Sequence, residues 1–260
     1  MNPPLYARRV NDRSPQRAAD RVRAVVADAW RTPEQRRLGL SLGAAVLSAI
    51  AFARIAEDYL TNDPLARWDV NFARWLSGQR DAVGTDIFRV VTFIGSPAAA
   101  ATIAIIVCVL LYRRRQLVEA ALLPVVFAGG ELLNVVLKLA FHRPRPEVAF
   151  VHLDTYSFPS GHAMLSTAVY GALTYLAWSH LRTRRKRLTL TAGTIVLVTL
   201  ICFSRLYLGV HYLSDVLGGA AGGAFWLAVS IALQTLCGER FERVFAGSSL
   251  DRLGRRMTRS

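Results

Sequence analysis

Residues 188–203, LTLTAGTIVLVTLICF, form a run that contains no charged side chain. With its flanks, this run reaches the roughly 20 mostly apolar residues that a helix needs to cross the hydrocarbon core of a bilayer. A similar run covers Ile103–Tyr112, and the chain of 260 residues is 53% hydrophobic. Because the apolar residues are concentrated in runs and not spread in amphipathic stripes, the sequence predicts an integral membrane protein.

The runs predict an all-α fold, an integral membrane bundle of six transmembrane helices. The second helix could begin as late as Pro97, with Ser96 as its N-cap. Residues 1–37 are polar and Arg-rich and lack the short apolar core of a signal peptide, so we interpret them as a cytoplasmic tail. Residues 237–260 form a second basic tail, and the membrane domain covers 38–236. The six helices are expected at 38–56, 90–112, 116–139, 162–180, 188–206 and 212–236.

The segment between the first two spans has a different pattern. Trp68, Phe72, Trp75 and Leu76 fall at positions i, i+4, i+7 and i+8, with charged residues between them. This spacing predicts a short amphipathic helix. Such a helix either lies in the membrane interface or packs over the mouth of the bundle.

The distribution of basic residues predicts the orientation. The formal net charge is +14, but the cations cluster just outside the apolar runs and are not interleaved with aromatic side chains, which argues against a nucleic-acid partner. Arg113–Arg115, the basic loop at 182–187 and both tails lie on the same side of a six-span topology. The positive-inside rule makes this side, with both termini, cytoplasmic.

Polar residues of a different kind mark the opposite ends of four successive spans. Lys138 ends the third span, His162 begins the fourth, Arg205 ends the fifth and His211 begins the sixth. A chain that crosses four times in succession brings these ends to one face. By the charge rule, that face is extracytoplasmic.

The first of three polar segments contains Lys138 and, after six residues, Arg145-Pro146. Lysine offers phosphate a compact charge and arginine binds two of its oxygens, although cations at a helix end can also simply snorkel. The chain has only two lysines against 30 arginines (32 − 2). A lysine at 138 is therefore more consistent with a functional role than with an arbitrary flanking cation. Glu131 and Asn134 share a helical face with Lys138, so they either orient it or form structural hydrogen bonds between helices.

The second segment is Pro159-Ser160-Gly161-His162. Ser160 is expected to cap the following helix, and Gly161 allows the backbone to approach a ligand closely. The free N–H groups of a helix N-terminus suit an anion. His162, in the first turn, is placed to donate a proton to a leaving oxygen; ordinary capping is the alternative interpretation.

The third segment contains Ser204-Arg205, then His211 and Asp215, which are four residues apart and share a helical face. The carboxylate can accept a hydrogen bond from one ring nitrogen, which leaves the other free to attack phosphorus. Neither an HExxH motif nor a zinc-binding spacing of cysteines is present, because the three cysteines are far apart in the chain. The alternative is a structural His–Asp pair.

The combined pattern Lys-x6-Arg-Pro, Pro-Ser-Gly-His, Ser-Arg-x5-His-x3-Asp resembles the three-part signature of the type-2 phosphatidic acid phosphatase and vanadium haloperoxidase superfamily, in its membrane lipid-phosphatase branch. The resemblance implies a phosphoric ester or diphosphate hydrolase that forms a phosphohistidine on His211, with Asp215 orienting it and His162 as proton donor. It implies that the phosphoryl oxygens are held by five residues and that no metal or other cofactor is required. These five are Lys138, Arg145, Ser160, Gly161 and Arg205.

The membrane setting favours a lipid substrate over a soluble ester. Candidates are phosphatidic acid, phosphatidylglycerol phosphate and undecaprenyl diphosphate, acted on at the extracytoplasmic face of a bacterial cytoplasmic membrane. Alternatives are a lipid phosphotransferase, a sugar-phosphate phosphatase and a non-catalytic lipid-phosphate transporter or binder. The oligomeric state cannot be read from the sequence.

Overall fold

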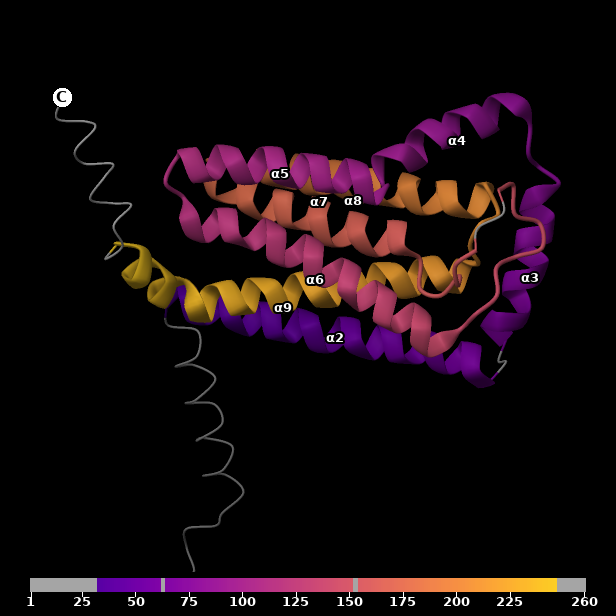
Figure 1. The fold of residues 1–260 in the computed structure, drawn as a ribbon, viewed down its shortest axis with the longest axis horizontal. Coiled ribbons are helices and arrows are strands. Elements are labelled where there is room, and N and C mark those ends of the chain that lie inside the picture. Colours follow the sequence, from indigo (N-terminus) through magenta and orange to yellow (C-terminus); the bar gives the residue numbers. More distant parts are fainter. Residues whose placement is uncertain (1–31, 62–63, 152–153, 247–260) are drawn as a thin grey trace, which may run out of the picture.

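The computed structural model describes residues 32–61, 64–151 and 154–246, so most of both predicted tails lies outside the described residues. Within this part the chain is helical and contains no strand, which confirms the all-α class. The long helices run alongside one another, and α3 crosses one end of them (Figure 1). The helices are α2 (Pro33–Thr61), α3 (Pro64–Ser77), α4 (Ala82–Ile94), α5 (Pro97–Arg113), α6 (Leu117–Phe141), α7 (Gly161–His180), α8 (Arg184–Tyr207) and α9 (Leu213–Ala246).

The chain is a multi-pass membrane protein. Four of the described helices are long and apolar enough to cross a bilayer, namely α2, α6, α8 and the Leu213–Gly238 part of α9, and the bent pair α4 and α5 makes a fifth. The helix α7 has 20 residues but is not among these candidates. The crossing predicted at 162–180, and with it the total of six, therefore stays a prediction.

The helix α7 lies in the middle of the bundle, in contact with α5, α6, α8 and α9. Ala168, Val169 and Ala172 of α7 pack in one core with Leu123 and Val126 of α6. A helix that is covered by neighbouring helices has little surface facing lipid. The mean hydropathy of α7, which is lower than that of the four candidate spans, therefore agrees with its place inside the bundle.

Glycines let α9 approach α7 closely. A Cβ on Gly219 would overlap the Ser160 carbonyl oxygen, and one on Gly223 would overlap that of Met164. Small residues at helix interfaces allow such close backbone contact in membranes. The close approach sets the start of α7 directly beside the start of α9.

The second predicted span differs from the structure at its start. The helix α5 begins at Pro97, and the Ser96 hydroxyl accepts a hydrogen bond from the Ala99 amide at 3.2 Å, as the N-cap prediction requires. Residues 82–94, which the sequence left largely outside a helix, form α4, bent by 42° from α5. An Asp81 side chain that accepts from the Gly84 amide begins α4 as a separate helix.

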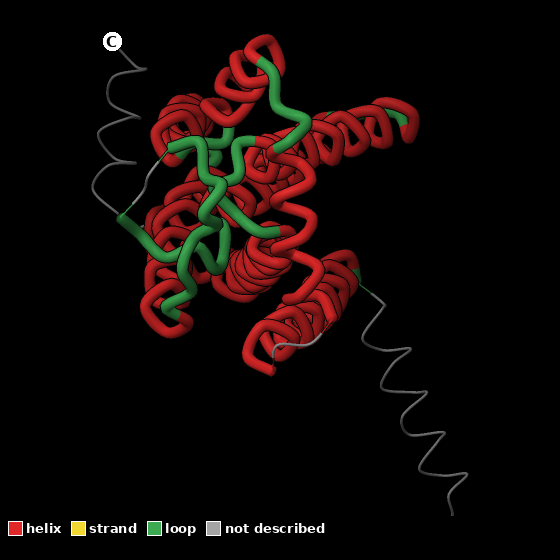
Figure 2. The backbone as a smooth tube through the Cα atoms, turned by 90° about the vertical axis from the view of Figure 1, so that its right-hand side faces the viewer, coloured by secondary structure: helices red, strands yellow, loops and turns green. Residues whose placement is uncertain are grey.

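The amphipathic helix predicted around Trp68 is confirmed as α3. Leu76 is buried, and Phe72 packs with it against Leu206 and Tyr207 of α8, whereas Trp75 is 60% exposed. The helix therefore packs over the bundle end with one face and leaves aromatic side chains uncovered on the other. Figure 2 looks onto this end, where the connecting loops cross the middle of the bundle.

Candidate active site

The three polar segments meet at the bundle end that α3 crosses. Lys138 lies near the end of α6, Arg205 near the end of α8, and Asp215 in the first turn of α9. Two contacts join the segments directly. The Ser160 amide donates to the Asp215 carbonyl at 2.9 Å, and Arg145 Nη1 lies 3.4 Å from His211 Nε2.

A tight turn between α8 and α9 positions His211 beside Arg145. Gly209 has φ +66°, a left-handed conformation that favours glycine. Arg80 packs against this turn, its Nε donating to the Tyr207 carbonyl at 2.5 Å and its Nη1 to the Val148 carbonyl at 2.7 Å. The chain therefore reverses between α8 and α9 within a few residues, and His211 immediately precedes α9.

His211 and Asp215 form a buried pair. His211 Nδ1 is 3.3 Å from Asp215 Oδ2, and their side chains are 3% and 0% exposed. An ionised carboxylate only accepts hydrogen bonds, so the ring proton belongs on Nδ1 and the Nε2 lone pair faces Arg145. Burial and the charges of Arg205, Arg145 and Lys138 hold the pKa of His211 well below its usual range. The imidazole is therefore neutral near pH 7, as a nucleophile requires.

The two cations of the first segment, Lys138 and Arg145, are held by carbonyl oxygens of the segments before α7 and α9. Lys138 Nζ donates to the carbonyls of Tyr156 and Ser157. Arg145 Nε donates to the Thr155 carbonyl at 2.7 Å, and its Nη1 to the Val210 carbonyl, also at 2.7 Å. Carbonyl contacts of this kind fix the position of a cation without neutralising its charge.

Two buried polar atoms of the predicted phosphate-binding residues lack a partner among the described residues. They are the Ser160 hydroxyl and Arg205 Nε, while Arg205 Nη1 donates to the Thr92 hydroxyl at 2.7 Å. Ser160 occupies the N-cap position of α7, but its hydroxyl makes no capping hydrogen bond, so the prediction of a side-chain cap is wrong. A buried donor without a partner is costly. Both atoms therefore suit an anion that accepts hydrogen bonds.

Asn134 hydrogen-bonds to the second polar segment and not to Lys138. Its Nδ2 lies 3.4 Å from the Pro159 carbonyl, and a Cβ on Gly161 would come within 3.0 Å of its Oδ1. Asn134 thus supports the loop before α7, at a point where glycine leaves it room. No hydrogen bond joins Glu131 to Lys138 in the described part of the chain, but the two side chains lie close enough for their charges to interact.

Two residues of the site, Arg143 and Asp69, were not identified from the sequence. Arg143 Nη1 donates to Asp215 Oδ1 at 2.7 Å and its Nη2 to Asp69 Oδ2 at 2.9 Å. The guanidinium lies 4.6 Å from the Tyr59 ring centroid and 4.3 Å from that of Tyr212. Two features of the sequence could have drawn attention to them: Arg143 is a second arginine two residues before Arg145, and Asp69 is a carboxylate within the predicted amphipathic helix.

Asp69 also connects α3 to the start of α9. It accepts from the Ser214 amide at 3.1 Å and from the Ser214 hydroxyl. Arg143, Asp69 and Asp215 have side-chain exposures of 5%, 0% and 0%. A continuous buried network therefore runs from α3 through Arg143 to the carboxylate that contacts His211.

Comparisons with known proteins identify the family. A model of the PAP2 superfamily matches residues 119–238, which include all three polar segments. Phosphatidylglycerophosphatase B of Bacillus subtilis (strain 168) is 34% identical over 142 residues, 53% of this chain and 69% of that protein. The chain belongs to the PAP2 superfamily. It is therefore a membrane-embedded phosphoric ester hydrolase.

Solved PAP2 structures share the fold. A transmembrane PAP2-type phosphatidylglycerolphosphate phosphatase from Bacillus subtilis has a TM-score of 0.67 at 28% identity, over 72% of this chain and 93% of that one. LpxE of Aquifex aeolicus has a TM-score of 0.50 at 22% identity, over 63% and 94%, which shows likeness of fold alone. Mouse sphingosine-1-phosphate phosphatase 2 is 36% identical over 81 residues, 31% of this chain and 22% of that protein.

Proposed function

We propose that this PAP2 enzyme is a lipid phosphatase that transfers the phosphoryl group to His211 and then to water. The observation that carries the proposal is the environment of His211: Nδ1 faces the buried carboxylate of Asp215, and Nε2 faces Arg145 at 3.4 Å. This arrangement presents a neutral lone pair next to a fixed cation. A phosphate held by that cation would lie beside the nucleophile.

The first step exchanges one bond to phosphorus for another. The Nε2 lone pair of His211 attacks phosphorus, and the bond from phosphorus to the lipid oxygen breaks. His162, in the first turn of α7, takes up a proton when the negatively charged phosphate binds beside it and donates that proton to the lipid oxygen. Lys138, Arg145 and Arg205 balance the charge that spreads over the phosphoryl oxygens.

The second step restores the enzyme. Water attacks phosphorus while His162 accepts a proton from it, the bond between phosphorus and nitrogen breaks, and inorganic phosphate leaves. The orphaned Ser160 hydroxyl and the Gly161 amide contribute donors to the phosphoryl oxygens in both steps. No step needs a metal ion.

The substrate we propose is a lipid phosphomonoester or diphosphate: phosphatidic acid, phosphatidylglycerol phosphate or undecaprenyl diphosphate. The membrane-spanning helices support a lipid, because its chains can remain in the hydrocarbon while the headgroup reaches the bundle end. The Bacillus phosphatidylglycerophosphatase B supports a glycerophospholipid in particular. We place this end of the bundle on the extracytoplasmic face of a bacterial cytoplasmic membrane and both termini in the cytoplasm, by the positive-inside rule.

The test is phosphate release by the detergent-purified full chain, with EDTA present, across these three lipids and a soluble sugar phosphate. We expect lipid hydrolysis that EDTA does not change and that His211→Ala abolishes. His180→Ala, at the opposite end of α7, is the matched control and should retain full activity. Turnover by folded His211→Ala protein would contradict the nucleophile, and transfer to an added acceptor lipid without phosphate release would indicate a phosphotransferase.

A further inference from the structure

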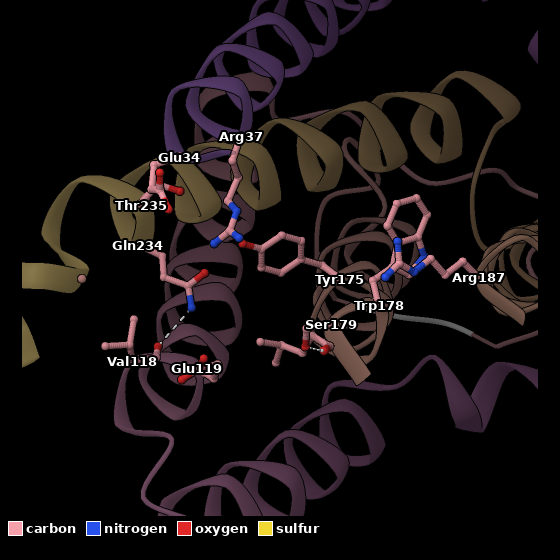
Figure 3. A pocket seen from close by; sticks show the side chains of 12 residues that line it. Glu34, Arg37, Val118, Glu119, Tyr175, Trp178, Ser179, Arg187, Gln234 and Thr235 are labelled. Carbon is pink, nitrogen blue, oxygen red and sulfur yellow. Dashed lines mark hydrogen bonds between the residues drawn. The ribbon is translucent and has the colours of Figure 1, made fainter. Parts of the chain in front are cut away.

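A polar cavity lies at the opposite end of the bundle from His211. Its volume is about 520 Å³, and it is lined by the beginnings of α2, α6 and α8, by the end of α7, and by Gln234, Thr235 and Gly238 of α9. Figure 3 shows the side chains that line it. None of the residues of the three polar segments contributes to it.

Two arginines in this cavity are each placed against an aromatic ring. The Arg37 guanidinium carbon lies 5.9 Å from the centroid of Tyr175, and that of Arg187 lies 5.8 Å from the centroid of Trp178. The Leu181 carbonyl accepts from Arg187 Nε at 3.0 Å, which further limits this side chain. Pre-positioned guanidinium groups are suited to bind the oxygens of a phosphate.

The same cavity contains hydrogen-bond acceptors, one of which is buried without a donor among the described residues. Gln234 Nε2 donates to the Val118 carbonyl at 3.2 Å, but its Oε1 is buried without a partner among the described residues. Figure 3 shows this oxygen on the side of the amide that faces Tyr175, away from Val118. The carboxylates of Glu34 and Glu119 also line the cavity. Since carboxylates and amide oxygens accept hydrogen bonds, this side of the cavity suits an ammonium group.

An apolar groove adjoins the polar cavity. The groove has a volume of about 300 Å³ and shares Val118, Gln234 and Gly238 with the cavity. It continues between α6 and α9 along Leu122, Val125 and Leu233. A ligand that fits both spaces has a polar head and an apolar chain lying along the helices, as a membrane lipid does.

We propose that this cavity and groove bind a zwitterionic aminophospholipid, with phosphatidylethanolamine as the headgroup chemistry that matches. The phosphodiester lies between Arg37 and Arg187, and the ammonium faces Glu34, Glu119 and Gln234. Two cations and two carboxylates balance this headgroup, whereas an anionic headgroup without an amine would leave its phosphate facing the carboxylates. This lipid is separate from the substrate and lies at the opposite membrane surface.

The first experiment is native mass spectrometry of the full chain, with phosphatidylethanolamine, phosphatidylcholine or phosphatidylglycerol added singly. We expect one phosphatidylethanolamine to be retained at least tenfold better than the other two. Arg37→Gln combined with Arg187→Gln should lower its retention at least tenfold. Arg184→Gln, a basic residue at the same bundle end outside the cavity lining, and His211→Ala should retain it. Equal retention of the three lipids, or no effect of the double substitution, would overturn the assignment.

A second experiment uses the wild-type cavity and does not depend on how its variants fold. Cys237 is exposed and lines the apolar groove, whereas Cys108 and Cys202 are partly buried. In nanodiscs, a maleimide should label Cys237 several-fold more slowly when phosphatidylethanolamine replaces phosphatidylcholine, in a chain carrying Cys108→Ala and Cys202→Ala. Equal labelling rates would show that the groove does not take this lipid.

Discussion

Replacing Arg143 by methionine should damage both the stability of the protein and its catalysis. The substitution retains a long, unbranched side chain but removes the guanidinium that contacts both buried carboxylates, at 2.9 Å from Asp69 and 2.7 Å from Asp215. Both carboxylate side chains are 0% exposed. Removal of one partner from a buried ion pair costs about 3–5 kcal/mol, because the remaining charge has no compensation.

The expected fall in thermal stability follows from this value. For a chain of this size, about 1 kcal/mol corresponds to roughly 2–4 °C in Tm, so Arg143→Met should lower Tm by about 6 °C or more. Arg54→Met is the matched control, because its ion pair with Glu57 at 3.0 Å is exposed, with side-chain exposures of 77% and 56%. An exposed pair is worth about 0–1 kcal/mol, so the control should change Tm by a few degrees at most.

Kinetics separates positioning of His211 from a purely structural role. Arg143 supports the Asp215 carboxylate but lies outside the phosphate-binding residues, so we expect kcat to fall at least tenfold with KM nearly unchanged. Arg143→Lys keeps the charge and should recover part of kcat, although one ammonium group cannot reproduce the fork of a guanidinium. The reasoning is refuted if Arg143→Met and Arg54→Met lower Tm equally, or if folded Arg143→Met keeps kcat within twofold of wild type.

Three further predictions concern pH, packing and topology. Because the pKa of His211 is lowered well below its usual range in the folded protein and is about 6.5 when unfolded, its contribution to stability is present above pH 6.5 and is lost as the pH falls below it. One such group costs about 1.4 kcal/mol at pH 5.5, so Tm should fall less between pH 7.5 and 5.5 in His211→Asn; equal falls would contradict this. Gly219→Ala should cost about 1–3 kcal/mol and reduce kcat, because its methyl group would overlap the Ser160 carbonyl. Gly43→Ala, where nothing lies within 4 Å, should be neutral or stabilising, and similar Tm changes in both variants would refute the packing argument. A fluorescent protein fused after Ser260 should fluoresce in the cytoplasm, whereas alkaline phosphatase fused there should stay inactive; the reverse pattern would invert the proposed orientation.

The sequence predicts best what depends on short spacing along the chain. The apolar runs that became α6, α8 and α9 are long and contain few charged residues, so their positions are set largely by composition. The segment around His211 and Asp215 is similarly local, because one helical turn brings these residues together. Helix parity then predicts that the three polar segments lie at one end, and the structure brings them together there, while their catalytic roles stay predictions.

What the sequence does not predict depends on contacts between distant segments. Asp69 and Arg143 are 74 residues apart, and nothing in either local pattern distinguishes a buried partner from an ordinary surface charge. The bend before α5 depends on the C-cap at Gly95 and the N-cap at Ser96, which divide one apolar region into two helices. Ser160 has the residue type of a cap, yet its hydroxyl is left without the hydrogen bond that its position offers.

The buried network from α3 to α9 has a consequence for the biosynthesis of the enzyme. His211 and Asp215 belong to the third of the three polar segments, so they leave the ribosome well after Asp69 and Arg143. A chain still being inserted therefore has the lysine and arginines of the first polar segment but not His211, and Arg143 has only one of its two carboxylates. With His211 as the nucleophile, as proposed above, phosphatase activity would begin only when the start of α9 is in place, so the nascent protein would not hydrolyse lipids of the membrane in which it is being assembled.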